Sequence, residues 1–593
     1  MHRQCLSTSR PGATVNLATP TSSPPTGRAA SPVPAPAKFP PLLPVILPLI
    51  VAAIVINVVF TWVFPGIDPQ RAGPDVRFTD ATAEVGIDFT HRHGSEPAPT
   101  TLGGGVSVLD FNRDESPDLF FVNGAPWPWS DSPWQSPATS KLYRNDGTGH
   151  FTDVTSTAGL DFVMNAMAAV TGDYDNDGFD DLFVTCIGGN RLFHNQGNGT
   201  FVEVTAEAGV GGEPNDWSTG ATWLDFNHDG RLDLIVTHYL RWPAEFGLAA
   251  AINFARVGRS YGTPVGYLGL FPTVYQNLGD GRFTPLRDHA GLRPTDPLTG
   301  FPREKTLAVT PVDANQDGRL DLLFSFHTGE NDLFLNTPDG RFAPWVSPDR
   351  VRREGIAAGI AAAGSLPLAP VNDTDDTFPL LRAFGSQAPI STPPNVVNLA
   401  EKLGWIPLDY DLDGHRELLV TGGTIEPDFA RIESDAPQLT APELRWNDGT
   451  TWHRSAPSAE TPAIPALAGR GSATADFDGD GDLDVVIAQN QAPAIFLRND
   501  QRAHQPWLRL SLSATRSHHS AGGARVEVHT PRHVIVRTLA PALSYLGQSE
   551  AVLTFGLGED TRIRRIVIRW PSGQRQEIRG ITINQSLHIT EPD

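Results

Sequence analysis

Cysteine is scarce in this sequence, with only Cys5 and Cys186 among 593 residues. A small secreted fold stapled by disulfides is therefore excluded. At this length the chain is expected to form several domains or a repeat architecture. Basic side chains are also few, since 45 Lys and Arg face 67 Asp and Glu, for a net charge of −22. This balance argues against a nucleic-acid partner, because binding phosphates requires a basic surface.

Residues 41–64 contain no charged side chain. As a helix they would extend roughly 36 Å, enough to cross a hydrocarbon core of about 30 Å. Residues 1–40, rich in Pro, Ser, Thr and Ala, are expected to be disordered, and their charges are all basic. The positive-inside rule places this tail in the cytoplasm. We therefore predict a single-pass membrane protein, with a cleaved signal peptide as the alternative.

This anchor implies that everything after a linker at residues 65–75 is periplasmic or extracellular, with a bacterial inner membrane as the expected location. A disulfide between the two cysteines is then excluded, because the membrane separates them.

An acidic motif recurs six times in the exported part. Its pattern is Asp-x-(Asp/Asn)-x-Asp-x-x-x-(Asp/Glu) followed by an apolar run, as in "DYDNDGFDDLFVT". After most copies comes a strand ending in an Asn-Gly type turn and an aromatic strand, as in "LFHNQGNGTFVEVT", which is a hairpin signal. Each unit thus supplies about one four-stranded blade, and repeats at this spacing predict a propeller or a solenoid.

The two ends of the repeat region favour the propeller. The last motif lacks a following aromatic strand, whereas "VRFTDATAEVGI" at 76–87 is such a strand without a motif before it. If that strand completes the last blade, no sheet edge is left open. The sequence therefore predicts a β-propeller over 76–503 with six blades, and a seventh within 343–404 as the alternative. Residues 239–272 are expected to be loops on one face.

The carboxylates at alternate positions suit calcium, which takes six to eight oxygen ligands. In the second copy a backbone carbonyl at Phe179 would add a ligand, and Gly178 would allow the sharp turn. The alternative is that Asp and Asn only make polar turns. The first copy has Glu115 where glycine is expected, so its site is expected to be weak or empty. We predict up to six structural calcium sites, with side-chain ligands Asp110, Asn112, Asp114 and Asp118; Asp173, Asp175, Asp177 and Asp181; Asp225, Asn227, Asp229 and Asp233; Asp313, Asn315, Asp317 and Asp321; Asp409, Asp411, Asp413 and Glu417; and Asp476, Asp478, Asp480 and Asp484.

These motifs resemble the calcium-binding repeats of the FG-GAP/VCBS type. Residues 504–593 lack the motif and contain strand-like runs that predict a small all-β domain, β-sandwich-like in form. "GGARVEV", "SYLGQSE", "FGLGE" and "IRWPSGQRQEI" resemble the ASPIC/UnbV domain, which in its family follows such a propeller. The chain resembles the bacterial members of that family and, more distantly, the animal cartilage acidic protein.

The repeat and the resemblance imply an all-β protein, and the uncharged run at 41–64 implies that it is membrane-anchored and exported. We expect an adhesion or binding scaffold that holds a protein or glycan ligand on the propeller face. The alternative is a calcium-dependent carbohydrate-active enzyme of lyase or dehydratase type, although no catalytic residue is assigned. His91 and His93 are weak ligand-binding candidates, and His518 and His519 are interpreted as solvated turn residues.

Overall fold

The computed structural model describes residues 78–92, 103–125, 138–241, 252–254, 258–260, 269–293, 302, 305–326, 332–345, 404–423, 439–447, 449, 452–454, 464–500, 505–542 and 544–593. The predicted tail, anchor and linker at residues 1–75 lie outside this part of the chain. No helix among the described residues is long and apolar enough to span a membrane.

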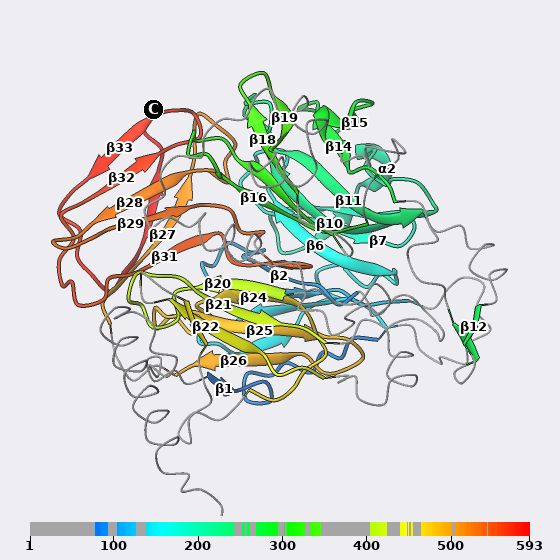
Figure 1. The fold of residues 1–593 in the computed structure, drawn as a ribbon, viewed down its shortest axis with the longest axis horizontal. Helices are drawn as coiled ribbons and strands as arrows, with labels where there is room; N and C mark the ends of the chain where they lie inside the picture. Colours follow the sequence, from blue (N-terminus) through cyan, green and yellow to red (C-terminus); the bar gives the residue numbers. More distant parts are fainter. Residues whose placement is uncertain are drawn as a thin grey trace, which may run out of the picture. The chain divides into compact units, whose positions relative to one another are not determined.

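Six sheets contain the six acidic motifs, each with four strands paired antiparallel, and we call them motif sheets 1 to 6 (Figure 1). In each, the motif loop connects the first two strands. A hairpin supplies the last two strands in sheets 1 to 5, whereas in sheet 6 these two strands come from opposite ends of the repeat region. Sheet 1 contains β2 (Val106–Leu109), β3 (Asp118–Phe121), β4 (Lys141–Asn145) and β5 (Phe151–Asp153); sheet 2 contains β6 (Ala166–Gly172), β7 (Asp181–Cys186), β8 (Arg191–Asn195) and β9 (Phe201–Glu203); sheet 3 contains β10 (Asp216–Leu224), β11 (Asp233–Arg241), β14 (Thr273–Asn277) and β15 (Phe283–Pro285). Sheet 4 contains β16 (Thr306–Val312), β17 (Asp321–Phe326), β18 (Asp332–Thr337) and β19 (Arg341–Trp345); sheet 5 contains β20 (Gly404–Leu408), β21 (Glu417–Thr421), β22 (Glu443–Asn447) and β23 (Trp452–Arg454); sheet 6 contains β24 (Gly469–Ala475), β25 (Asp484–Gln489), β26 (Ile495–Asn499) and β1 (Phe78–Asp80).

The N-terminal strand β1 completes sheet 6, as the sequence predicted. It pairs antiparallel with β26, in a register that sets Phe78 opposite Asn499 and Asp80 opposite Leu497. Two segments from the ends of the repeat region thus share one sheet. Among the described strands, each sheet remains open, with two edge strands.

The cores lie between consecutive motif sheets. Every residue of β6 and β7 is buried, which accounts for their continuous apolar runs. One cluster joins Phe120 of sheet 1 to Leu182 of sheet 2, and another joins Val106 of sheet 1 to Phe496 of sheet 6. Residues 346–403, which hold most of the region of the alternative seventh blade, lie outside the described residues. The choice between six and seven blades therefore stays open.

The insertion predicted as loops at 239–272 begins inside β11. Its described part also contains a two-stranded hairpin of β12 (Ile252–Phe254) and β13 (Gly258–Ser260). Two short helical turns, α2 (Thr205–Ala208) and η3 (His289–Gly291), follow the hairpins of sheets 2 and 3.

Residues 505–593 form the C-terminal module, in which two sheets share one core. One sheet has the order β31-β27-β34, and the other has the order β29-β28-β32-β33. Leu510 of one sheet and Val528 of the other belong to the same buried cluster, as expected for a sandwich-like domain. The strands are β27 (Trp507–Ser513), β28 (Arg525–His529), β29 (Val534–Thr538), β31 (Val552–Gly556), β32 (Arg565–Arg569), β33 (Arg575–Ile578) and β34 (Gln585–Thr590).

A short segment of the C-terminal module inserts among the first strands of the motif sheets. Its strand β30 (Gly547–Gln548) pairs parallel with β2. The Gln548 amide hydrogen-bonds Thr171 of β6 in both directions, and Leu546 is buried in a cluster with Met167 and Trp217. The sequence singled out "SYLGQSE" only as a family signature, whereas the structure shows that this segment docks the module onto the motif sheets.

Candidate metal centres

All six motif loops share one backbone conformation. Counting from the first aspartate, position 4 has positive φ in every loop, between 56° at Leu412 and 77° at Gly479. Position 6 is also left-handed, and five loops have glycine there, which adopts this conformation without strain. Glu115 of loop 1 takes the same conformation at φ 64°. The missing glycine therefore leaves the shape of loop 1 unchanged.

The carboxylate at position 1 holds the turn by accepting backbone N–H groups from positions 5 and 6. In loop 2, Asp177 and Gly178 both donate to Asp173 at 2.9 Å. The same pair of bonds, at 2.9–3.1 Å, is made to Asp110, Asp225 and Asp313. In loops 5 and 6 the position 6 N–H groups of Gly414 and Gly481 donate to Asp409 and Asp476.

The carboxylate at position 9 connects the loop to the hairpin of its own sheet. Each accepts the backbone N–H of an asparagine that ends the third strand, and in loop 2 this bond runs from Asn195 to Asp181 at 2.8 Å. The same contact joins Asn145 to Asp118, Asn277 to Asp233, Asn336 to Asp321, Asn447 to Glu417, and Asn499 to Asp484. All six carboxylates are buried.

Burial raises the pKa of these position 9 carboxylates, because the charged form loses its hydration. The pKa of Asp118, Asp233 and Asp321 rises to about 8, and that of Asp181 to about 7. The pKa values of Glu417 and Asp484 are raised well above the ordinary range, again chiefly by burial. A bound cation would offset this cost of ionisation.

Loops 2, 5 and 6 bring three carboxylates together. Oxygens of positions 1, 3 and 5 lie within 4.8 Å of one another in loops 2 and 6, and those of positions 1, 3 and 9 do so in loop 5. In loop 5 the Oδ1 atoms of Asp409 and Asp411 are buried without a hydrogen-bond partner. Their pKa values are raised, first by burial and then by neighbouring carboxylates. Such converging, unsatisfied oxygens fit a hard divalent cation.

Loops 1, 3 and 4 do not form such a cluster among the described residues. Position 3 is asparagine in these loops, and the side-chain amides of Asn112 and Asn315 donate to the position 5 carboxylates of their own loops at 2.8 Å. In loops 3 and 4 an arginine at position 7 pairs with the position 5 carboxylate, as Arg231 does with Asp229 and Arg319 with Asp317. The predicted ligands are therefore neighbours in all six loops, but carboxylates converge in only three.

Several functional contacts were not foreseen from the sequence. His194, from the hairpin of sheet 2, lies 3.0 Å from Asp181 and 3.5 Å from Asp175 and joins the loop 2 cluster. Its pKa is raised, first by the hydrogen bond to Asp181. His194 could have been noticed from the sequence, because the hairpin segment "LFHNQG" that contains it recurs in similar form near every motif.

The same hairpin asparagines also join neighbouring sheets. The side-chain amide of Asn195 in sheet 2 donates to the carbonyl of Phe111 in loop 1 at 2.9 Å. Equivalent bonds run from Asn145 to Phe477, Asn277 to Tyr174, Asn336 to Phe226, and Asn499 to Tyr410. The Asn447 amide of sheet 5 instead donates to Arg416 in its own loop.

The C-terminal module contacts three of the motif loops. Arg509 donates to Asp476 at 2.7 Å and also pairs with Glu550, while Arg537 contacts Asp409 at 3.3 Å. His519 lies 3.5 Å from Asp173. These loops are the three in which carboxylates converge among the described residues, and the module supplies an arginine to two of them, loops 5 and 6. Burial lowers the pKa of His519, its contact to loop 2.

The remaining histidines are placed differently from expectation. His91 is buried, and its Nδ1 accepts a long 3.5 Å bond from the backbone of Gln491. His93 lies outside the described residues. The interpretation of His518 as a solvated turn residue is wrong, since it is buried and its Nε2 lies 3.1 Å from the carbonyl of Gly522.

Two family models match the chain. The FG-GAP-like repeat model matches residues 110–184, 173–236 and 409–487, and the ASPIC and UnbV model matches residues 514–593. Among curated proteins, human cartilage acidic protein 1 is 30% identical over 54% of this chain, and the mouse protein of that name is 37% identical over 54%. The chain covers only 40% and 41% of the length of these relatives.

Solved structures give weaker likenesses. An Agrocybe aegerita lectin that recognises non-reducing terminal N-acetylglucosamine is 13% identical over 68% of this chain and 82% of its own, with a TM-score of 0.29. Trypanosoma rangeli sialidase in complex with sialic acid is 9% identical over 72% of this chain and 59% of its own, with a TM-score of 0.30. At these scores nothing is inferred from them. The family models and the curated relatives are consistent with each other: the chain has regions that match FG-GAP-like repeats and a C-terminal region that matches ASPIC and UnbV, and it is similar over 54% of its length to cartilage acidic protein 1.

Proposed function

We propose that this chain is an exported, membrane-anchored, calcium-stabilised β-propeller that serves as a binding scaffold for a protein or glycan ligand. The observation that carries the calcium assignment is loop 5, where Asp409, Asp411 and Glu417 converge and two buried carboxylate oxygens lack partners. Carboxylates in this arrangement repel one another unless a cation lies between them. Loops 2 and 6 likewise bring three carboxylates together, through positions 1, 3 and 5, and the other three loops would provide weaker sites.

Calcium would act structurally in this scaffold. A cation at positions 1, 3 and 5 would fix the loop whose position 9 carboxylate holds the hairpin, and the hairpin asparagine holds the next sheet. A calcium ion present at about ten times its dissociation constant would add roughly 1.4 kcal/mol per site to the stability of the folded state. Three strong sites would add about 4 kcal/mol, a large part of the net stability of a typical domain.

The scaffold role follows from the chain's organisation. Propellers present loops from all blades on one face. The segment around Leu546 of the C-terminal module is buried among the first strands of the motif sheets, so the module covers part of the inner edge of these sheets. The uncharged run at 41–64 and the basic tail before it support the anchor and the export of the remainder. The acidic net charge favours partners other than nucleic acid.

Thermal unfolding of the full chain in detergent tests the calcium assignment. We expect the melting temperature to rise by several degrees between EDTA and millimolar calcium, and much less with magnesium, which prefers a rigid octahedral site. Equal melting curves in EDTA and calcium would contradict it, and the motifs would then serve only as turns. With calcium present throughout, arrays of glycans and of surface proteins would identify the ligand.

A further inference from the structure

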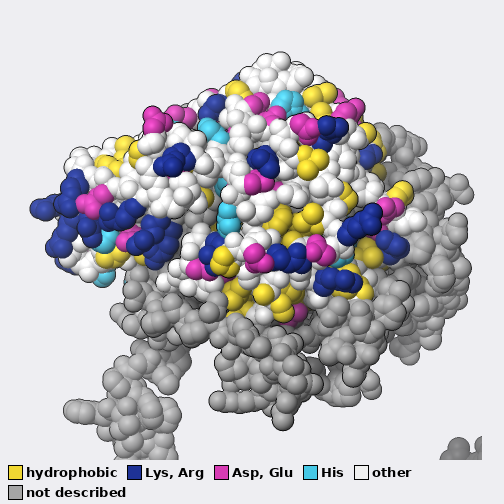
Figure 2. Space-filling view, turned by 90° about the horizontal axis from the view of Figure 1, so that it is seen from above, with side chains coloured by type: hydrophobic (Ala, Val, Ile, Leu, Met, Phe, Trp, Pro, Cys, Tyr) yellow, Lys and Arg dark blue, Asp and Glu magenta, His cyan; other side chains and the backbone are white. Residues whose placement is uncertain are grey.

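The C-terminal module has the opposite charge to the rest of the chain. Residues 507–593 contain eleven arginines, no lysine and seven acidic side chains, a net charge of +4, whereas the whole chain carries −22. In Figure 2 the dark-blue side chains gather at one end of the molecule. A basic surface on an acidic protein requires an explanation, because the structure uses only Arg509 and Arg537 of these arginines to contact motif loops.

Many of the remaining arginines lie on one face of the sheet β29-β28-β32-β33. The strand registers align Arg525, Arg569 and Arg575 in one row across three strands. A second row lies four residues further along β28. There the register sets His529 opposite Arg565, and Arg579 directly follows β33. Buried apolar residues alternate with these positions on β28 and face the core. The outward face therefore has two basic rows.

In the part of the chain that the structure describes, two carboxylates lie between these rows. Glu527 pairs with Arg525, His529 and Arg569, and Glu577 pairs with Arg565, Arg575 and Arg579. Five arginines thus share two glutamates. Cationic charge on this face exceeds what the protein itself neutralises, and a focused positive potential attracts anions from solution.

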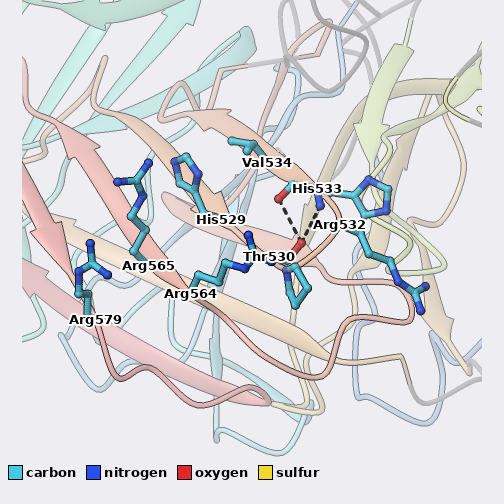
Figure 3. A pocket seen from close by; sticks show the side chains of 9 residues that line it. His529, Thr530, Arg532, His533, Val534, Arg564, Arg565 and Arg579 are labelled. Carbon is cyan, nitrogen blue, oxygen red and sulfur yellow. Dashed lines mark hydrogen bonds between the residues drawn. The ribbon is translucent and has the colours of Figure 1, made fainter.

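A pocket lies at the end of the second row. It has a volume of about 380 Å³ and is lined by His529, Thr530, Pro531, Arg532, His533, Val534, Arg564, Arg565 and Arg579. Figure 3 shows Arg565, Arg579 and His529 on one side of the β28–β29 turn and Arg532 on the other. Thr530 and His533 hold this turn by reciprocal hydrogen bonds of 3.0–3.1 Å. Arg532 is partly neutralised by Glu559 and lies 3.8 Å from Asp560, while Arg579 has 70% of its side chain exposed.

We propose that this pocket and the adjoining arginine rows form a binding site for an acidic polysaccharide, with one sulfate or carboxylate group in the pocket and further groups along the rows. Guanidinium groups bind such oxyanions through paired hydrogen bonds in a fixed planar geometry. The site is distinct from the propeller face and from the motif loops. Its test is therefore independent of the calcium sites and of the ligand proposed above.

A long anion chain fits this surface better than a single anion or a membrane. One small anion would engage the pocket alone and leave the row of Arg525, Arg569 and Arg575 unused, about 13 Å away along the strands. A membrane-docking surface combines basic residues with apolar groups that insert into the lipid. On this face Val534 is the large exposed apolar side chain, with an exposure of 39%.

Binding of a heparin octasaccharide and a hyaluronan octasaccharide to the full chain tests the proposal, in detergent with calcium fixed at 1 mM. The first carries sulfates and carboxylates, and the second carries carboxylates alone. We expect the variant R564Q/R579Q to weaken binding of the tighter octasaccharide at least tenfold at low salt. The matched control R282Q/R516Q, which removes two exposed arginines outside the face, should change it less than twofold. All three proteins should melt at the same temperature, because no replaced side chain is buried.

The competing outcomes are distinct. The proposal is overturned if neither octasaccharide binds the wild type, or if the control variant loses binding as strongly as R564Q/R579Q. It is also overturned if inorganic sulfate displaces the bound octasaccharide at a concentration equal to that of the anionic groups of the octasaccharide, since the arginine rows would then contribute nothing to binding. Binding to phosphatidylglycerol vesicles without binding to either octasaccharide would assign the face to a lipid surface instead.

Discussion

Loops 2, 5 and 6 differ from loops 1, 3 and 4 at one motif position, the third, which is aspartate in the first group and asparagine in the second. Both groups have the same left-handed residues at positions 4 and 6 and the same hairpin contact at position 9. Carboxylates converge only in the aspartate group. The shape of the loop therefore does not require the full carboxylate set, and turn chemistry is sufficient for three of the six loops.

The additional carboxylates of the aspartate group repel one another and destabilise the folded loop, so their presence needs another explanation. In loops 3 and 4, Arg231 and Arg319 neutralise part of the charge from within the loop. In loops 5 and 6 an arginine of the C-terminal module pairs with the position 1 carboxylate. Two buried carboxylate oxygens of loop 5 nevertheless have no hydrogen-bond partner. Of the two interpretations of the motif, polar turns suffice for loops 1, 3 and 4, and the proposed calcium would offset the additional carboxylate charge of loops 2, 5 and 6.

The largest expected effect is the pH dependence of stability in EDTA. Four of the buried position 9 carboxylates, Asp118, Asp181, Asp233 and Asp321, have a pKa of about 7 to 8 in the folded state, against an ordinary value near 4 in the unfolded chain. Between these values the folded state binds more protons, so its stability falls as pH rises from about 4 to 8. Each group contributes at most about 1.4 kcal/mol per pH unit.

Denaturant unfolding at pH 5 and pH 8 measures this effect. In EDTA the midpoint should be higher at pH 5, and in millimolar calcium the difference should shrink or reverse, because calcium binds only the ionised loops. If the midpoint in EDTA rose with pH, the buried carboxylates would not be the dominant titrating groups.

Position 9 should matter equally in both groups of loops. Replacing Asp181 or Asp321 by asparagine keeps the shape of the side chain but puts an NH₂ group where one of two backbone N–H groups donates, leaving that N–H group unpaired. We expect a loss of about 2 kcal/mol in either variant, with or without calcium. Chemical denaturation of both variants in EDTA provides the measurement. A loss confined to Asp181→Asn would show that the hairpin contact depends on the metal.

Position 3 should separate the two groups. Asp411→Asn is expected to weaken calcium binding at loop 5 at least tenfold and to remove about 1 kcal/mol or more of the calcium-dependent stabilisation. In EDTA the same variant should be slightly more stable, since like charges are removed. Calorimetric titration should count three tight calcium ions in the wild type and two in this variant.

The reverse change serves as the matched control for position 3. Asn227→Asp in loop 3 should gain little, because Arg231 already occupies the position 5 carboxylate. Six equal calcium sites in the wild type would contradict the division into two groups.

The sequence predicted the repeated part of the molecule well for a physical reason. The motif, the apolar run and the Asn-Gly turn are local signals, and the pairing of β1 with β26 followed from counting which unit lacked a strand. The contacts of Arg509, Arg537 and Gln548 with the motif sheets were not foreseen, because they join residues far apart in the chain without any periodicity. The residue at position 3 distinguishes the two groups of loops in the sequence. Its effect on carboxylate convergence could not be predicted, because it depends on the arginines at position 7 and on the directions of the side chains.

The hairpin asparagines provide the smallest and most local prediction. The side-chain NH₂ group of Asn195 donates to Phe111 in the neighbouring sheet as well as to Asp180 in its own loop, whereas among the described residues the NH₂ group of Asn447 donates to Arg416 of its own loop alone. Replacing Asn195 by alanine removes a buried bond between sheets and leaves the Phe111 carbonyl without this donor, at an expected cost of about 1–2 kcal/mol. Asn447→Ala should cost about half as much, because its bond at 3.3 Å is longer and joins segments already connected through Glu417. Urea unfolding of the two variants in calcium compares them directly. If both lost the same stability, the bond between sheets would add nothing beyond the turn that each asparagine makes within its own sheet.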